Sequence, residues 1–289
     1  EQSLIRNRHN HKARQLKASI LRKMGRKEEA LKWVEDSLSL DQFNIGCLFE
    51  RYLLTHRQDE IDQIKRLLQD NYHTYLEYAL DFMDAGLYEE AAELLQLFLD
   101  EREEVYPIVY YTLGYIAFHN NDPDKAKNFY EKAASMSPDK CFPNRIEEVV
   151  ILKHALSLNP MDYKAFYYLG NFWYANRQYK EAIDCWEKSV KINDAFPTVL
   201  RNLSLAYYNK ANKKQEAKEL LEKAFSLDTS DARILMELDQ LYKKLNYSPV
   251  ERLSFLEKHL SVVEERDDLY LERITLYNQL GNYEKAKEL

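Results

Sequence analysis

Pairs of neighbouring carboxylates are the feature of this chain most suggestive of chemistry. They occur at Glu89–Glu90, Glu103–Glu104, Glu147–Glu148 and Glu264–Glu265. Two carboxylates that face one substrate can act as acid and base, as in glycoside hydrolysis. Adjacent side chains on a helix point about 100° apart, however, so these pairs do not converge on one substrate. We interpret them as solvated helix faces.

Histidine and cysteine offer little potential for a metal site. His9 and His11 stand two residues apart, a spacing that separates side chains on a helix. The three cysteines, Cys47, Cys141 and Cys185, are too scattered to suggest a disulfide framework or a metal cluster. The sequence also lacks a P-loop, a dinucleotide-binding glycine motif, H-E-x-x-H and G-x-S-x-G. We therefore expect no metal, no cofactor and no catalytic site.

The composition is that of a folded, acidic protein. The 289 residues are 45% hydrophobic and 31% charged, with a net charge of −7. Nucleic-acid-binding proteins usually carry a basic stripe, which is not evident here, and no run of about 18 apolar residues suggests a membrane span. Unpaired cysteines favour a reducing compartment, so we expect a cytoplasmic protein. Because the sequence starts at Glu1 without methionine and stops within a helical pattern, we expect a fragment of a longer protein.

A recurring alanine sets the period of the chain. It opens the predicted second helix of a hairpin at Ala30, Ala91, Ala126, Ala182, Ala217 and Ala286. Ala91 and Ala126 are 35 residues apart, as are Ala182 and Ala217. The longer intervals between these alanines divide into full and shortened units. In the unit before Ala286, Arg252 occupies the position of the recurring alanine. The chain is therefore predicted to consist of helical hairpins of about 34 residues.

Residues 163–196 show the pattern inside one unit. Phe166, Leu169, Gly170 and Trp173 repeat at helical spacing, and Ala182, Trp186 and Ser189 do the same after a polar turn. Small residues such as Gly170 and Ala182 let two backbones approach, while large ones such as Trp186 fill the remaining space. Such a hairpin cannot bury its apolar face alone, so we predict that neighbouring hairpins stack.

The pattern resembles the tetratricopeptide repeat. In residues 107–140 the matching residues are Tyr110, Leu113, Gly114, Ala117, Ala126, Tyr130, Ala133 and Pro138. Comparable matches occur in residues 72–106 and in residues 197–231, the latter with one residue inserted in the turn. The resemblance implies an all-α fold, a right-handed α-solenoid of about eight hairpins, two of them shortened.

Departures from the pattern divide the chain. Residues 45–71 form one shortened unit, and residues 141–160 have lost most of a first helix, which leaves one helix from about Asn144 to Leu158. We predict an N-terminal sub-array at 1–140, a shortened unit or junction helix at 141–160, and a C-terminal sub-array at 161–289 whose last unit is truncated. Arg252 and His259 stand where small residues are expected, so we predict looser packing in residues 232–266.

The resemblance also implies a binding groove on the concave face, lined by the first helices. The corresponding residues include Tyr111, Tyr115, Lys164, Tyr167, Asn171, Tyr174, Arg201 and Tyr208. Tyrosine suits recognition because it combines rigid contact area with a hydroxyl group. The same rings would serve equally well to fill a tight superhelix or to contact another domain.

Some family members clamp the carboxylate at the end of a peptide. Asn171, Asn202 and Arg233 match parts of that clamp in this chain. Tyr167 stands where the clamp needs a lysine, and Glu237 would repel a carboxylate. The clamp is incomplete, although Lys164, Arg201 and Arg233 still favour an acidic segment.

We expect a non-catalytic scaffold that binds a protein or peptide in this groove. A second resemblance offers an alternative. The stretches NPMDYKAFYYLGNFWY, AIDCWEKSV and DDLYLERITLYNQLGNYEKA are similar to large bacterial proteins in which a β-sandwich region, itself similar to sugar-processing folds, precedes such repeats. That resemblance implies an accessory region that docks on and positions a carbohydrate-active domain of the parent protein.

Overall fold

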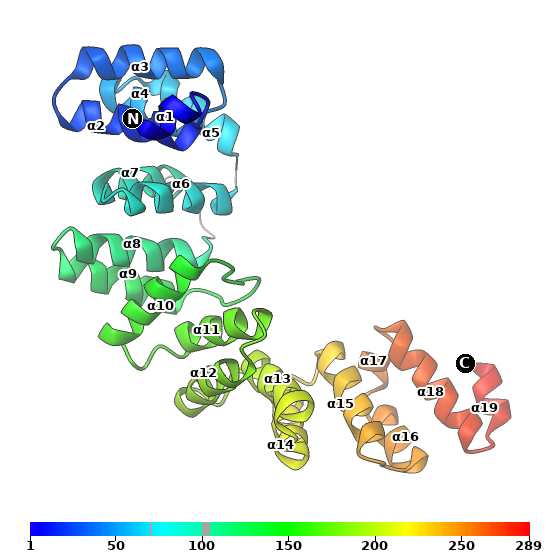
Figure 1. Cartoon of the computed structure of the whole chain (residues 1–289). Helices are drawn as coiled ribbons and strands as arrows, with labels where there is room; N and C mark the ends of the chain where they lie inside the picture. Colours follow the sequence, from blue (N-terminus) through cyan, green and yellow to red (C-terminus); the bar gives the residue numbers. More distant parts are fainter. Residues whose placement is uncertain (70, 100–104) are drawn as a thin grey trace. The chain divides into compact units, whose positions relative to one another are not determined.

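The computed structural model of the chain is built from α-helices. It describes residues 1–69, 71–99 and 105–289, and these ranges contain no strand. The chain divides into two compact units, one formed by Glu1–Cys141 with Arg145–Leu158 and the other by Phe142–Asn144 with Asn159–Leu289. Figure 1 shows the helices of both units. The all-α fold class built from helical hairpins is therefore confirmed.

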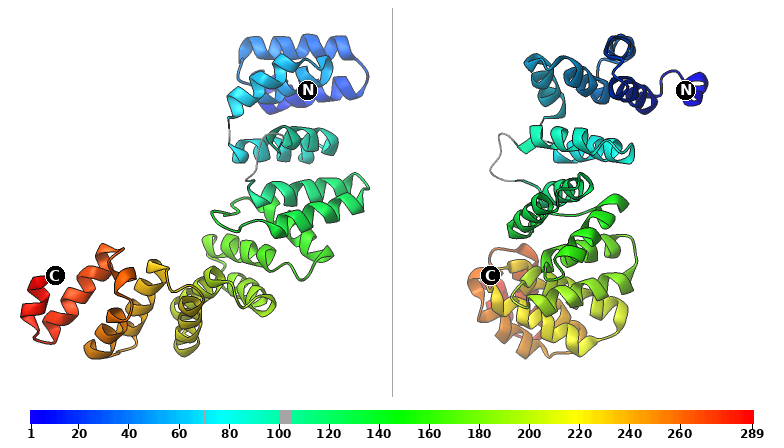
Figure 2. Two further views of the ribbon diagram at one scale, coloured as in Figure 1. Left: turned by 180° about the vertical axis from the view of Figure 1, so that it is seen from behind. Right: turned by 90° about the vertical axis from the view of Figure 1, so that its left-hand side faces the viewer.

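The described part of the first unit holds four helical hairpins and two additional helices, α1 and α10. Its helices are α1 (Gln2–Arg6), α2 (His11–Lys23), α3 (Lys27–Leu40), α4 (Ile45–Thr55), α5 (Gln58–Leu68), α6 (Tyr72–Asp84), α7 (Tyr88–Leu99), α8 (Pro107–His119), α9 (Pro123–Ser135) and α10 (Ile146–Leu158). The pairs α2–α3, α4–α5, α6–α7 and α8–α9 pack as hairpins, which Figure 2 shows from two sides. The helix α10 lies close to the bounds expected from the sequence and packs on α8.

The second unit repeats the hairpin four times. Its helices are α11 (Tyr163–Ala175), α12 (Tyr179–Ile192), α13 (Pro197–Ala206), η1 (Tyr207–Ala211), α14 (Lys214–Leu227), α15 (Ala232–Lys244), α16 (Pro249–Glu257), α17 (Leu260–Val263), α18 (Asp267–Gln279) and α19 (Tyr283–Glu288). The segment η1 is a π-helical turn, a form that accommodates an extra residue in a helix. It lies where the sequence predicted one inserted residue.

Close approach of two helices holds each hairpin together. Five of the six alanines that set the repeat are completely buried, namely Ala30, Ala91, Ala126, Ala182 and Ala217, and Ala286 is partly buried. A Cβ atom placed on Gly114 would lie 2.5 Å from the Tyr130 ring, and one on Gly170 would lie 2.3 Å from Trp186. These two positions therefore need glycine, because the partner helix carries a large ring directly opposite.

The hairpin of α15 and α16 replaces the small residues with a buried ion pair. Arg252 donates to both carboxylate oxygens of Asp239, at 3.0 and 2.6 Å, and both side chains are buried. Arg252 also donates to Glu272 on α18 at 2.7 Å. This charged pair fills the position of the small residues, and α15 and α16 approach each other less closely than the helices of the other hairpins, in keeping with the predicted looser packing. The second helix is interrupted near His259, between α16 and α17.

A left-handed residue ends the first helix of most hairpins. The residues with positive φ at this turn are Gly25, His56, Gly86, Asn121, Arg177, Asn212, Asn246 and Gly281, with φ between 52° and 75°. Glycine and asparagine adopt this conformation readily, whereas other side chains crowd the backbone. Arg177 and His56 are therefore the strained members of this set.

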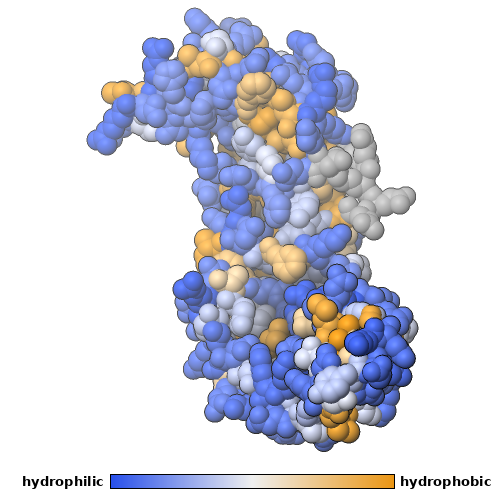
Figure 3. All heavy atoms as spheres, turned by 90° about the vertical axis from the view of Figure 1, so that its right-hand side faces the viewer, coloured by the Kyte–Doolittle hydropathy of each residue, from blue (hydrophilic) through white to orange (hydrophobic). Residues whose placement is uncertain are grey.

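The surface is mainly hydrophilic with small hydrophobic patches, as Figure 3 shows for one face. One apolar stripe follows α2, where Leu16, Ile20 and Met24 are 42, 50 and 62% exposed. Within the part of the chain that the structure describes, no helix is long and apolar enough to cross a membrane.

Replacing Arg252 by alanine should destabilise the protein by about 3–5 kcal/mol, because Asp239 would remain as an uncompensated buried charge. The double variant Asp239→Ala/Arg252→Ala should recover most of that loss, since it restores the small residues of the other hairpins and leaves Glu272 paired with Lys243. Urea unfolding of the two variants measures the difference. A double variant as unstable as Arg252→Ala would contradict this account of the ion pair.

Replacing Arg177 by glycine should stabilise the protein by about 0.5–1 kcal/mol, because relief of the left-handed strain exceeds the entropic cost of glycine. Gly86→Ala is the converse variant, since its new Cβ meets no atom within 4 Å and only the strain is added. The two melting temperatures should move in opposite directions. A shift of both in the same direction would show that the turn conformation is not the cause.

Candidate functional site

Three residues predicted to line the groove lie instead in the core. Tyr111, Lys164 and Tyr167 are 0, 8 and 3% exposed. The Tyr111 ring packs 6.3 Å from the ring of Tyr130, and the Tyr167 ring packs 4.9 Å from that of Phe196. Burial also lowers the pKa of Lys164. Their placement on an open surface is corrected, because neighbouring helices cover them.

The remaining predicted tyrosines are partly exposed and supported by neighbours. The Tyr115 ring lies 4.4 Å from His119, and the Tyr174 ring lies 5.3 Å from Trp186. The ammonium group of Lys244 lies 5.4 Å from the centre of the Tyr208 ring. These rings are fixed by packing and still reach the surface.

Four predicted polar residues come together in the second unit, which we call the Asn171 cluster. Asn202 Nδ2 donates to Asn171 Oδ1 at 3.2 Å, so that α13 is joined to α11. Arg201 on α13 donates to Asn202 and pairs with Glu237 on α15. Arg233 Nε donates to the same carboxylate at 3.4 Å. The first helices of three successive hairpins thus share one polar network.

The Asn171 cluster has spare hydrogen-bonding capacity. Asn171 Nδ2, Arg201 Nε and Glu237 Oε2 are buried, and none has a hydrogen-bond partner among the described residues. Buried polar atoms are nearly always paired, so three unpaired atoms in one network are unusual. Glu237, which the sequence suggested would repel a carboxylate, here shares its charge with two arginines.

The acidic pairs are only partly solvated. Glu89 is 81% exposed, but Glu90 is buried and forms ion pairs with Arg22 at 2.8 Å and Lys23 at 2.6 Å. The interpretation of this pair as a solvated face is therefore wrong for Glu90, which faces α2. The pair Glu103–Glu104 lies outside the described residues.

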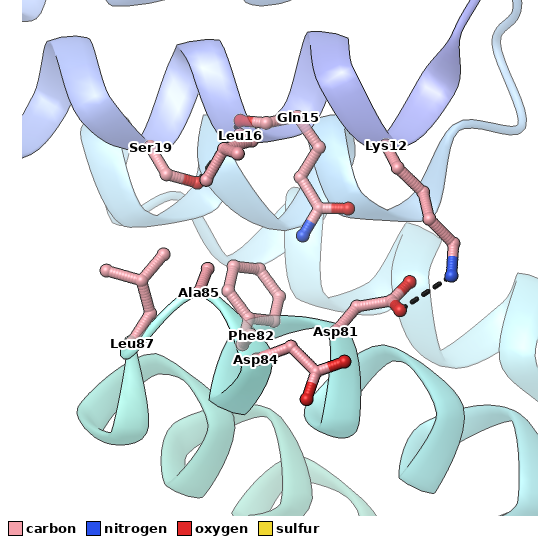
Figure 4. Close-up of a pocket in the computed structure, with 9 residues that line it drawn as sticks. All are labelled: Lys12, Gln15, Leu16, Ser19, Asp81, Phe82, Asp84, Ala85 and Leu87. Carbon is pink, nitrogen blue, oxygen red and sulfur yellow. Dashed lines mark hydrogen bonds and ion pairs between the residues drawn. The ribbon is translucent and has the colours of Figure 1, made fainter.

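A cleft of about 280 Å³ lies between α2 and α6, and Figure 4 shows its lining. Lys12 on α2 reaches across to Asp81 on α6, with Nζ 2.7 Å from Oδ1. The apolar part of the lining includes Leu16 and Phe82. The chain's own lysine therefore neutralises part of the acidic wall of this cleft.

A second cavity, of about 180 Å³, lies where α6, α8 and α10 meet, and we call it the tyrosine cavity. Its polar lining consists of Asp84, Tyr88, Tyr115 and Glu147. The sequence interpretation missed it, because it assigned Glu147 to a solvated helix face. Glu148, the other member of that pair, is buried and accepts a hydrogen bond from the Arg145 backbone at 2.9 Å.

Two histidines adjoin the tyrosine cavity. The His119 ring stacks on Tyr88 with ring centres 4.7 Å apart and planes within 3°. His154 Nδ1 lies 2.7 Å from the hydroxyl oxygen of Tyr130, and its ring meets Tyr115 edge-on. Burial, and then the nearby His119, lower the pKa of His154. The His154 ring is therefore mainly neutral near pH 7, and its Nδ1 shares a hydrogen bond with the Tyr130 hydroxyl.

Residues 1–69, 71–99 and 105–289 contain no group of three or more histidine, cysteine, aspartate or glutamate side chains placed to bind a metal ion. His9 and His11 do not form such a group. Cys47 and Cys141 are buried, and Cys185 is partly buried.

Comparison with protein families identifies the hairpins. Family models described as tetratricopeptide repeats match residues 11–44, 108–140 and 163–196. These segments correspond to α2–α3, α8–α9 and α11–α12. The chain therefore carries tetratricopeptide repeats.

Several solved structures are similar at low identity. MamA 41-end from Desulfovibrio magneticus RS-1 is 19% identical with a TM-score of 0.38, and the alignment covers 68% of this chain and 96% of that one. Pseudomonas aeruginosa PilF is 18% identical with a TM-score of 0.42, covering 75% and 87%. YrrB, described as a TPR protein with an unusual peptide-binding site, is 16% identical with a TM-score of 0.29, covering 81% and 94%. With TM-scores this low, the similarities do not assign a function to this chain.

The stability of the protein should fall as the pH drops below about 6.5, partly because of His154. Its folded-state pKa is lowered, so the unfolded chain takes up the proton first and is favoured at low pH. The loss for this one group should stay below about 1 kcal/mol, since His154 is only partly buried. Urea unfolding at pH 7.5 and 5.5 measures it.

His154→Gln is the matched control for this effect, because glutamine accepts the Tyr130 hydrogen bond without titrating. His73 and His259, whose pKa values burial also lowers, remain in both proteins. The variant should lose less stability than the wild type on acidification. Equal losses would mean that His154 does not contribute.

Proposed function

We propose that this chain is a non-catalytic scaffold that binds an extended peptide segment of a partner protein at the Asn171 cluster. The tetratricopeptide repeats support an interaction role. The observation that carries the proposal is the set of three buried, unpaired polar atoms in that cluster.

The chemistry of these atoms suits a peptide backbone. Asn171 Nδ2 and Arg201 Nε are donors, and Glu237 Oε2 is an acceptor. An extended peptide presents carbonyl acceptors and N–H donors along its length, so it can satisfy both kinds of group. Each hydrogen bond gained contributes about 0.5–1.5 kcal/mol to binding.

The charge of the cluster favours an acidic or neutral peptide over a basic one. Arg201 and Arg233 share the single carboxylate of Glu237, which leaves one positive charge in excess. An approaching carboxylate would compete with Glu237 for the exposed guanidinium of Arg233, whose side chain is 63% exposed. The peptide's own carboxylate is then a supplementary contact, and its backbone is the main one.

A second proposal is that the repeats bind another domain of the same, longer protein. The exposed stripe of Leu16, Ile20 and Met24 on α2 would suit a surface covered by another domain, such as the β-sandwich region that the sequence resemblance implies. The complete reading frame tests this idea, since it must then encode such a domain. Purified as separate proteins, the domain should bind wild-type repeats and should not bind a Leu16→Glu/Ile20→Glu variant.

The peptide proposal is tested by selecting binders from a random peptide display library with the wild-type protein. Selected peptides should bind Asn171→Ala/Asn202→Ala at least about tenfold more weakly in fluorescence anisotropy, a loss of about 1.4 kcal/mol. Asn278→Ala is the matched control, because Asn278 is exposed on α18, and it should bind like the wild type. Circular dichroism verifies that both variants are folded.

Two results would refute the role of the Asn171 cluster. One is a selection that yields no binding peptide. The other is a set of peptides that bind the double variant and the wild type equally, since contact would then lie elsewhere on the chain.

A further inference from the structure

The tyrosine cavity combines an apolar floor with an acidic, aromatic wall. Leu80, Met83 and Ile151 are buried side chains that line it, and Val150 lines its exposed side. The carboxylates of Asp84 and Glu147 come from different helices, α6 and α10. The cavity thus offers an apolar surface to the methylene groups of a ligand side chain. It also offers two carboxylates to a positively charged group at the end of that side chain.

Charge in the tyrosine cavity is unbalanced. No lysine or arginine occurs among its described lining residues, and neither Asp84 nor Glu147 has an ion-pair partner within the described parts of the chain. Asp84 also lines the neighbouring cleft, where Lys12 lies against Asp81. One cleft away, Lys12 thus already reaches from α2 to an aspartate on α6.

The two tyrosines are held in place before any ligand arrives. Tyr88 stacks on His119, and Tyr115 contacts both His119 and His154. Burial, and then the nearby Tyr88, raise the pKa of Tyr115, so its phenol is neutral near pH 7. Neutral tyrosine faces attract cations, and fixed rings lose little entropy on binding.

We infer that the tyrosine cavity binds a lysine or arginine side chain of a partner peptide. The aliphatic stem lies on the apolar floor, and the cationic group reaches Asp84 and Glu147 beside the two tyrosines. This site lies in the first unit and the Asn171 cluster in the second, so the inference stands independently of the proposed function. It assigns a basic residue to a partner that occupies this cavity.

Methyl NMR tests the inference directly, because Met83 and Ile151 carry methyl groups in the cavity lining. The full chain is titrated with the acetylated, amidated peptide Gly-Gly-Lys-Gly-Gly and with versions that carry arginine or norleucine in place of lysine. The lysine and arginine peptides should shift these methyl signals saturably, with at least about fivefold tighter half-saturation than norleucine. Norleucine retains the stem but lacks the charge.

Charge-matched variants distinguish binding in this cavity from a general electrostatic attraction of basic peptides to an acidic protein. Asp84→Asn/Glu147→Gln should weaken the lysine response at least about fivefold, and Tyr115→Leu about threefold. Glu28→Gln/Glu35→Gln removes the same charge from the exposed face of α3 and should leave the response unchanged. Unperturbed methyl signals elsewhere in each variant verify the fold.

Three outcomes would overturn the inference. They are the absence of shifts at Met83 and Ile151, equal half-saturation for the lysine and norleucine peptides, and equal weakening by the cavity variant and the α3 control. The first would mean that the peptide does not enter the cavity. The second would mean that the cavity recognises only the aliphatic stem, and the third that the peptide binds through the overall charge of the protein.

Discussion

Close approach of two helices, with a side chain of one filling the space left by a small residue of the other, holds most hairpins of this protein together. Gly114 with Tyr130 and Gly170 with Trp186 meet this constraint by shape. Ser204 meets it by donating a hydrogen bond from its hydroxyl to the Ala217 carbonyl at 2.6 Å. Stacking and binding surfaces both depend on these crossings, because they set the spacing of the first helices.

Neighbouring hairpins are also joined by buried ion pairs. Arg22 on α2 donates to Glu50 on α4 at 2.7 Å and to Glu90 on α7 at 2.8 Å, and Ser19 completes the network. Both carboxylates are buried, so each depends on its partner for solvation. Such a network stabilises one relative placement of its helices, since a shift would leave a buried charge unpaired.

The repeat was predictable from the sequence because small and aromatic residues recur at fixed spacing, and five of its alanines are fully buried. The sequence left open whether Tyr111 and Tyr167 line a groove or fill the superhelix, because helical spacing gives the face of a residue but not the helix that covers it. The ion pair of Arg252 was not predicted, because its partner Asp239 lies on the other helix of the hairpin. The tyrosine cavity was missed for the same reason, since Asp84 and Glu147 meet only in the folded unit.

The π-helical turn η1 shows how this architecture tolerates a change of length. The extra residue widens one turn at the end of α13, and α14 then resumes with Ala217 completely buried. The crossing of α13 and α14 is therefore kept, with Ser204 still donating to the Ala217 carbonyl. An insertion at this hairpin end is thus absorbed where it occurs, so a gene for such a chain can gain a single codon there while the packing of the next helix is preserved.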